Sequence, residues 1–588
     1  MASGPGETFG RGYLRRTPDR RALFGKVDDI SVLAFGRVRL DDAELPATQA
    51  GVTALAAAWR RHGGELPAHL EGEFLLALAS GASGEWLAAV DRFSTLRLYF
   101  ATSRGQAAFG TVPIAVAKAL GLTPEVDPQA VLAYAYFHVI PAPLSIVTGV
   151  RRLDHGEALA GDGQGAWTAR RYWLPAFHED RPFDFTAERE RFLGALRAGV
   201  GECVEGLDAD EVGCFLSGGT DSSTIAGLVT ERFGSGARTF SIGFGVSGYD
   251  ETRYSRIATE HFKTRHTEYY LTPADVEQAL PVVAADYEQP FGNASAAPTY
   301  FCARIAARAG VRRMLGGDGG DELYGGNERY AKQWVFSIWG EVPASVRQDV
   351  IEPLLFGPLR GVEAGLVGKA RSYVAQTRVP LPDRLQGNYN LLDRFGRSSV
   401  FTDAFLARAA PFEPTAFARE VWGRCDARSQ INRLLAYDFK FTLADSDLPK
   451  VTRMCEAAGT EVSFPMLTRG VTEHSLALAP DQKLRRTQLR YFFKNALRGF
   501  LPEEILRKEK HGFGMPFGAW VVAQPGLQAL ADDALAGLVE RGYIRSEFIG
   551  QLRAAMESGH AGYYGTMAWI LAVLELWLRE HMPDARGG

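Results

Sequence analysis

The pattern of apolar and polar positions changes character once along the chain. Up to about residue 180, apolar residues alternate with polar ones in short runs, such as 30–40, 73–80 and 85–91, which Gly, Ser and Asp separate. These runs predict β-strands joined by tight turns. Residues 48–63, between the first two runs, have helical spacing and predict one helix. The N-terminal region is therefore expected to be rich in β-structure.

A second pattern begins near residue 185, where apolar strands alternate with helical stretches. Helical spacing over 188–207 precedes an apolar strand, 211–219, that opens into a Gly-rich turn. A helix over 223–234 and a further strand over 237–244 follow. This alternation predicts a doubly wound, parallel α/β sheet. Beyond about residue 330 the pattern is mostly helical.

The two patterns meet in a charged, Pro-containing run over residues 170–185, which has the composition of a linker. We therefore predict two domains, 1–180 and 185–588. The composition is that of an ordinary globular protein, with 46% hydrophobic residues, 23% charged residues and a net charge of −4. Neither this charge nor any basic run favours nucleic acid or a membrane surface as a partner.

Five cysteines, none in a CxxC pair, are spread over the chain. This spacing indicates reduced thiols rather than a disulfide framework or a zinc site. The N-terminus lacks the apolar segment of a secretory signal, and no uninterrupted apolar stretch reaches the ~20 residues that a membrane-spanning helix needs. We expect a cytoplasmic protein.

The clearest chemical signal is the loop LSGGTDSS, residues 216–223, between an apolar strand and a helix. Its glycines let backbone N–H groups face an anion, and the helix N-terminus adds a favourable dipole. A carboxylate among these donors fits a phosphate site if magnesium bridges it to the phosphates. The simpler alternative is a turn in which Asp221 caps the helix. The candidate binding residues are Leu216, Ser217, Gly218, Gly219, Asp221 and Ser222.

A second candidate loop, GGDGGDELYGG over residues 316–326, follows another apolar strand. Its three carboxylates, Asp318, Asp321 and Glu322, would repel one another without a cation. Six glycines in eleven residues leave room for a ligand close to the backbone. That room favours a binding loop over a solvated acidic loop.

Together the two loops resemble the SGGxDS and GDGGDE loops of the asparagine synthetase superfamily of ATP pyrophosphatases. Such enzymes cut ATP between its α and β phosphates and form an adenylate. The resemblance implies that Asp221 and Asp321 hold Mg²⁺ and the pyrophosphate. The residues that it implies to contact ATP include Leu216, Ile242, Gly316 and Gly317.

The stretch RKEKHGFGMP, residues 507–516, resembles the family's RPKQGFGVP, which makes Lys510 the counterpart of the catalytic lysine. A fixed cation suits this chemistry because attack on the α-phosphate and attack on the adenylate both build negative charge. A surface basic cluster is the alternative.

A further segment, 448–468, resembles the family's RVDRMSMAHGLEARVPFLD type, with Ser463 and Thr468 where the family has Arg and Asp. Glu461 remains and is a candidate to orient or deprotonate the attacking amine, together with Asp318. An ordinary ion pair is the alternative role for Glu461.

The N-terminal region resembles the class II glutaminase half of asparagine synthetases, with Asp91-Arg92-Phe93 matching its DRF motif. The resemblance implies an Ntn-type αββα sandwich, whose nucleophile is a cysteine exposed as the first residue. Here Ala2 and Ser3 follow Met1, and the first cysteine is Cys203. We therefore expect a degenerate glutaminase domain, retained for packing or docking, and a synthetase that does not take ammonia from glutamine.

The same domain pair without the cysteine occurs in β-lactam synthetases and in the macrolactam synthetases of lasso peptides. β-lactam-forming members carry a tyrosine where Asp318 stands, so a lasso peptide cyclase is the first hypothesis. It implies ATP and Mg²⁺ as cofactors, a precursor (core) peptide as substrate, and a leader peptidase and a leader-recognition protein as partners. The alternatives are an ammonia-dependent asparagine synthetase, another small-molecule amide ligase, and a non-catalytic nucleotide-binding scaffold.

Overall fold

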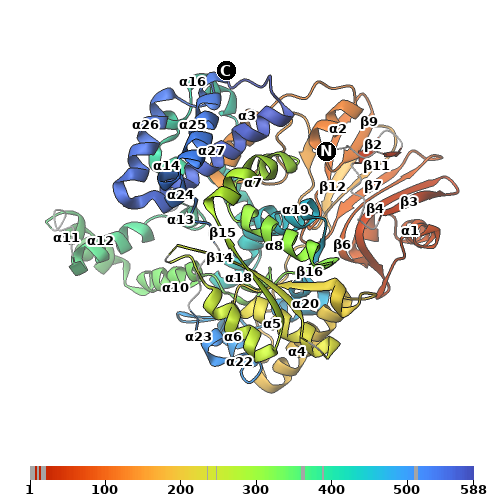
Figure 1. Cartoon of the computed structure of the whole chain (residues 1–588), viewed down its shortest axis with the longest axis horizontal. Helices are drawn as coiled ribbons and strands as arrows, with labels where there is room; N and C mark the ends of the chain where they lie inside the picture. Colours follow the sequence, from red (N-terminus) through yellow and green to blue (C-terminus); the bar gives the residue numbers. More distant parts are fainter. Residues whose placement is uncertain are drawn as a thin grey trace.

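The computed structural model describes residues 22–234, 236–246, 248–358, 365–386, 390–508 and 514–588, with the backbone of two short N-terminal strands, β1 (Glu7–Phe9) and β2 (Gly12–Leu14). A sheet-rich N-terminal region lies beside a smaller parallel sheet and a large helical C-terminal part (Figure 1). The chain is thus a mixed α/β protein, as the pattern of apolar positions predicts.

Besides the antiparallel β1–β2 pair, the described residues of the N-terminal region form two further antiparallel sheets. The larger has the strand order β12-β11-β7-β6-β4-β3, with β5 paired to β4, and the smaller has the order β10-β8-β9. Their bounds are β3 (Ala22–Val27), β4 (Ile30–Leu40), β5 (Ala43–Glu44), β6 (Leu70–Ser80), β7 (Trp86–Val90), β8 (Tyr99–Ser103), β9 (Gln106–Gly110), β10 (Arg151–Arg152), β11 (Glu157–Gly161) and β12 (Trp167–Arg171). The strands predicted over 30–40, 73–80 and 85–91 are confirmed as β4, β6 and β7.

These sheets pack face to face because each strand presents an apolar side to the other sheet. Phe35, Leu75 and Phe100 belong to the cluster that fills the space between them. Helix α1 (Gln49–His62) covers the opposite face of the larger sheet through Val52 and Leu55. Helix α2 (Pro113–Ala119) lies against β8 and β9, and helix α3 (Pro128–Phe137) follows it. The layers are therefore helix, sheet, sheet and helix; the Ntn type of this sandwich stays a prediction.

The second sheet is parallel throughout, with the order β15-β14-β13-β16-β17. The strands are β13 (Val212–Phe215), β14 (Arg238–Phe244), β15 (Arg265–Leu271), β16 (Arg313–Leu315) and β17 (Glu461–Ser463). The chain runs outward from β13 to β15 and then returns to place β16 on the other side of β13. This reversal opens a crevice at the carboxyl ends of β13 and β16, where open α/β sheets bind ligands.

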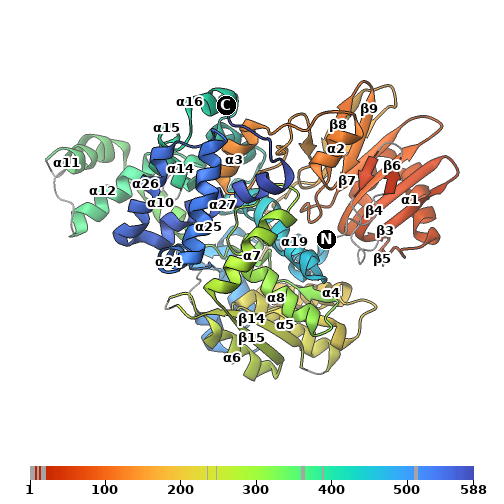
Figure 2. The same cartoon turned by 45° about the horizontal axis from the view of Figure 1, so that its top comes forward.

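Helices connect these strands and fill the C-terminal part (Figure 2). The connecting helices are α4 (Phe185–Cys203), α5 (Thr220–Phe233), α6 (Thr252–Phe262), α7 (Pro273–Asp286), α8 (Ala296–Arg308) and α9 (Gly320–Tyr324). The later helices are α10 (Glu328–Glu341), α11 (Glu352–Phe356), α12 (Gly365–Thr377), α13 (Asp383–Gln386), α14 (Leu391–Phe395), α15 (Arg397–Val400), α16 (Asp403–Ala409), α17 (Pro414–Gly423), α18 (Gln430–Asp438), α19 (Leu448–Ala458), α20 (Arg469–Ala477), α21 (Pro480–Lys483), α22 (Tyr491–Ala496), α23 (Glu503–Arg507), α24 (Phe517–Ala523), α25 (Pro525–Glu540), α26 (Ser546–Ala555) and α27 (Ala561–His581).

One helical stretch of the described residues, Ser546–His581, is long and apolar enough to cross a membrane by length and composition. In this fold 67% of its most apolar window is buried. Its last helix, α27, packs against α7, α24 and α25. A buried core helix of a globular protein can have the same length and hydropathy, so packing in the core accounts for the apolar composition of this stretch.

Candidate functional site

A large cavity lies in the crevice between β13 and β16. It has a volume of about 1110 Å³. Its walls include the loop after β13, the loop after β16, the middle of β14, the first half of α8, the start of α10, and residues from the range 487–508. The two loops that the sequence singles out, about a hundred residues apart, thus face one cavity.

The first loop presents the N-terminus of α5 to this cavity. Gly218 has φ +70°, and a Cβ there would lie 2.5 Å from the backbone nitrogen of Ser255. A side chain at this position would therefore both strain the backbone and clash with α6. The Ser217 N–H donates to Ser222 Oγ at 3.2 Å, and the two hydroxyl groups lie 3.1 Å apart. The loop thereby holds two hydroxyls and the first turn of a 14-residue helix toward one point, which suits an anion.

We call the loop after β16, residues 316–326, the acidic loop. Its three carboxylates lie in three different environments. Burial raises the pKa of Glu322 to about 8, so this carboxyl group is mostly protonated at neutral pH. Burial also raises the pKa of Asp318, to about 6, and Lys450 opposes this rise. Asp321 is paired with Arg490. The repulsion expected within this loop is therefore relieved by one protonation and by two nearby cations.

Arg490, which the sequence analysis did not single out, joins the two loops. Its Nη1 donates to Thr220 Oγ1 at 2.6 Å and to Asp221 Oδ1 at 2.8 Å. Its Nη2 donates to Asp221 Oδ2 at 2.6 Å and to Asp321 Oδ1. The side chain is 5% exposed, and Gly326 makes room for it, since a Cβ there would lie 2.2 Å from Arg490 Nε. A guanidinium thus lies between the two carboxylates that the resemblance assigns to magnesium.

Other lysines surround the same space. Lys450 Nζ lies 2.8 Å from Asp447 Oδ1, and Lys508 Nζ lies 2.9 Å from Glu251 Oε2. Lys494, on α22, also lines the cavity. Triphosphate binding needs several cations from different elements, and the cavity supplies them. Local sequence carries little signal for these lysines, because each is an ordinary charged residue until the fold brings it to the crevice.

Most of the predicted binding residues line the cavity. They are Leu216, Ser217, Gly219, Asp221, Ser222, Ile242, Gly317, Asp318 and Asp321. Gly218 and Gly316 shape the loops from behind the lining. Lys510 lies outside the described residues.

Glu461 is not brought to this cavity. It begins β17, whereas the cavity lies at the carboxyl ends of the strands, and its Oε2 lies 2.6 Å from Arg313 Nη2. Arg313 is 2% exposed, so the pair is an inter-strand ion pair at the far end of the sheet. The prediction that Glu461 handles the proton of the amine therefore finds no support in this geometry, and the alternative of an ion pair matches it.

The residues present fit ATP with a magnesium ion. Bound magnesium would neutralise charge on the phosphates. It is usually held by one or two carboxylates together with the phosphates, and Asp221 and Asp321 provide two. No cluster of three or more His, Cys, Asp or Glu side chains that could hold a metal ion occurs among the described residues. Arg490 would have to release both carboxylates for the ion to reach them.

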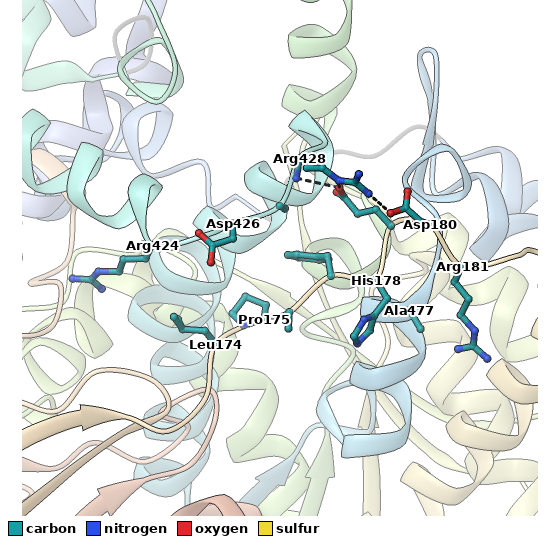
Figure 3. A pocket seen from close by; sticks show the side chains of 13 residues that line it. Leu174, Pro175, His178, Asp180, Arg181, Arg424, Asp426, Arg428 and Ala477 are labelled. Carbon is teal, nitrogen blue, oxygen red and sulfur yellow. Dashed lines mark hydrogen bonds and ion pairs between the residues drawn. The ribbon is translucent and has the colours of Figure 1, made fainter.

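A second cavity, of about 770 Å³, lies along residues 174–181, which connect β12 to α4, and against the residues just before α18 (Figure 3). Arg428 and Asp180 form an ion pair at its edge (Figure 3). Glu179 accepts hydrogen bonds from the Ser429 N–H and from Asn432 Nδ2, at 3.0 and 2.8 Å. These contacts tie the inter-domain segment to α18, so the cavity belongs to a structural junction.

The cavity combines a helix N-terminus suited to an anion, two neighbouring carboxylates and several cations. Together with the family matches, this site identifies the chain as an ATP-dependent, AMP-forming carbon–nitrogen ligase. Residues 195–579 match the model of the asparagine synthase family, and residues 39–173 match that of the glutamine amidotransferase domain. The chain belongs to the asparagine synthase family.

Individual relatives agree with this assignment. The chain is 26% identical over 526 residues to a putative glutamine-hydrolysing asparagine synthetase of Mycobacterium tuberculosis, covering 86% of this chain and 76% of that protein. It is 24% identical over 480 residues to asparagine synthetase 1 of Bacillus subtilis, covering 81% and 72%. A solved glutamine PRPP amidotransferase of B. subtilis matches 50% of this chain and 63% of the amidotransferase chain, at 11% identity. Its TM-score of 0.17 is too low to show a shared fold.

Proposed function

We propose that this ligase adenylates an Asp or Glu side-chain carboxylate of a precursor peptide and joins it to an amine of the same peptide, closing a macrolactam ring of the lasso type. AMP and pyrophosphate leave. Intramolecular capture of the adenylate is favoured because the two ends are held together in one site. A leader peptidase and a leader-recognition protein would supply the peptide.

The observation that carries this proposal is the state of the N-terminal domain. The cavity beside its DRF motif is about 40 Å³, which leaves room for only a few water molecules, and Phe464 and Leu467 of the synthetase part close one side of it. Asp91 is enclosed there, because its carboxylate accepts the N–H groups of Phe93 at 2.9 Å and Thr95 at 3.0 Å. The nearby Cys203 is buried, which raises the pKa of its thiol to about 12. A buried, protonated thiol is a poor nucleophile.

Such a domain supports a ligase whose amine does not come from glutamine. An intramolecular amine is the simplest alternative source. The cavity of about 1110 Å³ exceeds the ~300–1,000 Å³ of ordinary small-ligand pockets, which favours a second substrate, such as a peptide segment, beside the nucleotide. Asp318 lines that space, where it could accept a proton from the amine.

An ammonia-dependent asparagine synthetase is the second candidate. The relatives are named asparagine synthetases, which favours aspartate as the substrate, although their names give glutamine rather than ammonia as the nitrogen source. The two functions differ in substrate, so release of pyrophosphate and AMP separates them. The purified chain is incubated with Mg²⁺ and ATP, either with aspartate plus ammonia or glutamine, or with a candidate precursor peptide plus its leader peptidase.

Release only with the peptide, together with loss of one water from the peptide mass, is the expected result. Release with aspartate and ammonia but none with peptide would replace this proposal with the second candidate. The Asp221→Asn variant, run in parallel, shows whether the release belongs to the described cavity.

A further inference from the structure

The N-terminal domain contacts the synthetase part directly behind the acidic loop. Glu73, on β6, accepts the Phe464 N–H at 3.0 Å and the Ser463 hydroxyl at 2.9 Å. Arg37, on β4, lies 3.8 Å from Glu73 and donates to Ser463 Oγ at 3.3 Å. Arg37 also donates to the Glu202 carbonyl of α4 at 2.5 Å. Two strands of the N-terminal sheet thus hold the end of β17.

The segment that Glu73 holds is the one on which the acidic loop rests. The Gly316 N–H donates to the Ser463 carbonyl at 3.0 Å. The Phe464 ring packs so closely that a Cβ at Gly316 would lie 3.0 Å from it. A Cβ at Gly319 would lie 2.3 Å from Leu467 Cδ2. Both ends of the Gly316–Gly319 stretch therefore lie on residues that follow β17.

Another cross-domain contact lacks this connection. Arg39, also on β4, pairs with Glu205 at 2.8 Å. The Glu205 side chain is 57% exposed and lies just beyond α4, whereas that of Glu73 is 17% exposed. The Arg39–Glu205 pair joins the two domains without touching the segment beneath the acidic loop, so it provides a matched control.

We infer that Glu73 is a positioning residue for the nucleotide site, and that the N-terminal domain acts in the ligase by fixing the acidic loop. Glu73 fixes the end of β17, which in turn fixes the backbone from Gly316 to Gly319 and hence the direction of Asp318 and Asp321. The inference rests on the ATP chemistry of the family and is independent of which carboxylate and amine the enzyme joins.

The test measures binding of a nucleotide probe, so no substrate is needed. Isothermal titration calorimetry gives the Kd of α,β-methylene-ATP, which cannot be cleaved between its α and β phosphates, with Mg²⁺ in excess. We expect Glu73→Ala to raise the Kd about tenfold, because the acidic loop then loses the hydrogen bonds that fix its support. A hydrogen bond to a charged group contributes on the order of the 1.4 kcal/mol that corresponds to a tenfold change in Kd. Glu73→Gln keeps an acceptor for the Phe464 N–H and should restore binding to within about threefold of the wild type. Glu205→Gln should leave the Kd unchanged.

A variant from the other side of the interface covers the case in which Glu73→Ala does not fold. Ser463→Ala removes one donor to Glu73 and should weaken the probe about threefold, in the same direction. Unchanged binding by both Glu73→Ala and Ser463→Ala would overturn the inference. So would an equal loss in Glu205→Gln, because that result would assign the effect to domain adhesion. Failure of the peptide assay with normal probe binding would instead count against the proposed substrate.

Discussion

Replacing Arg490 by Met tests whether this guanidinium occupies the position of the magnesium ion. Arg490 makes four hydrogen bonds to Thr220, Asp221 and Asp321. Removing one partner of a buried ion pair costs about 3–5 kcal/mol. The side chains of Asp221 and Asp321 are 20% and 14% exposed, so water relieves part of this cost. We expect a loss near the lower end, about 3 kcal/mol, or a fall of roughly 5 °C in melting temperature for a domain of this size.

The same reasoning predicts how magnesium acts on this variant. Without Arg490, Mg²⁺ can reach the two carboxylates in the absence of nucleotide. At ten times its Kd it would restore about 1.4 kcal/mol. The wild-type protein should gain almost nothing, because the guanidinium already satisfies both carboxylates.

Differential scanning fluorimetry with and without Mg²⁺, and without nucleotide, measures both effects. Arg485→Met is the control, since Arg485 is exposed and donates to the neutral Tyr491 hydroxyl at 2.6 Å. Equal stabilisation of the wild type and Arg490→Met by Mg²⁺ would refute the reasoning. A loss of less than about 1 kcal/mol would refute the magnitude, since it is below the range for a broken buried pair.

Three further predictions follow from the loop geometry and the buried charges. Gly218→Ala should weaken nucleotide binding more than about tenfold in calorimetry. Gly234→Ala is the control, because Gly234 also has a positive φ (+64°) but no atom lies within 4 Å of its added Cβ. This control should cost about 1 kcal/mol of stability and leave the nucleotide Kd unchanged. Asp221→Asn should lower pyrophosphate release at least about a hundredfold at a fixed Mg²⁺ concentration, and an unchanged rate with an unchanged Mg²⁺ dependence would contradict the role of this carboxylate. Burial lowers the pKa of Lys483 to about 7, so the unfolded chain binds more protons than the folded chain above that pH. Stability should therefore rise from about pH 7 toward the unfolded pKa of about 10.4, and Lys483→Met should remove this rise in melting temperature.

The strands and helices that carry the site were predictable because their burial follows a simple period. The strand predicted over 237–244 is confirmed as β14, which is buried at every residue after the first, as expected of an inner strand of a parallel sheet. The glycines at 218 and 219 likewise indicated a tight turn before a helix, and the turn precedes α5. Local sequence specifies such features, so they can be read without the fold.

Contacts between distant segments could not be read in this way. Arg490 lies 269 residues from Asp221 in the chain, and nothing in its local pattern distinguishes it from Arg485 or Arg486. The role predicted for Glu461 depended on which end of β17 it would occupy, and the parallel sheet places it at the end away from the crevice. The charge states of the acidic loop depended on burial, which only the three-dimensional arrangement determines.

We propose that the enzyme activates a carboxylate as an adenylate and captures it with an amine of the same molecule. The most direct measurement uses a precursor peptide whose reacting carboxylate carries ¹⁸O on both oxygens, followed by mass spectrometry of nucleotide and peptide. We expect one ¹⁸O atom in AMP, one retained in the new amide, and a peptide that has lost one water. Appearance of ADP with label in inorganic phosphate, or AMP without label, would contradict this proposal.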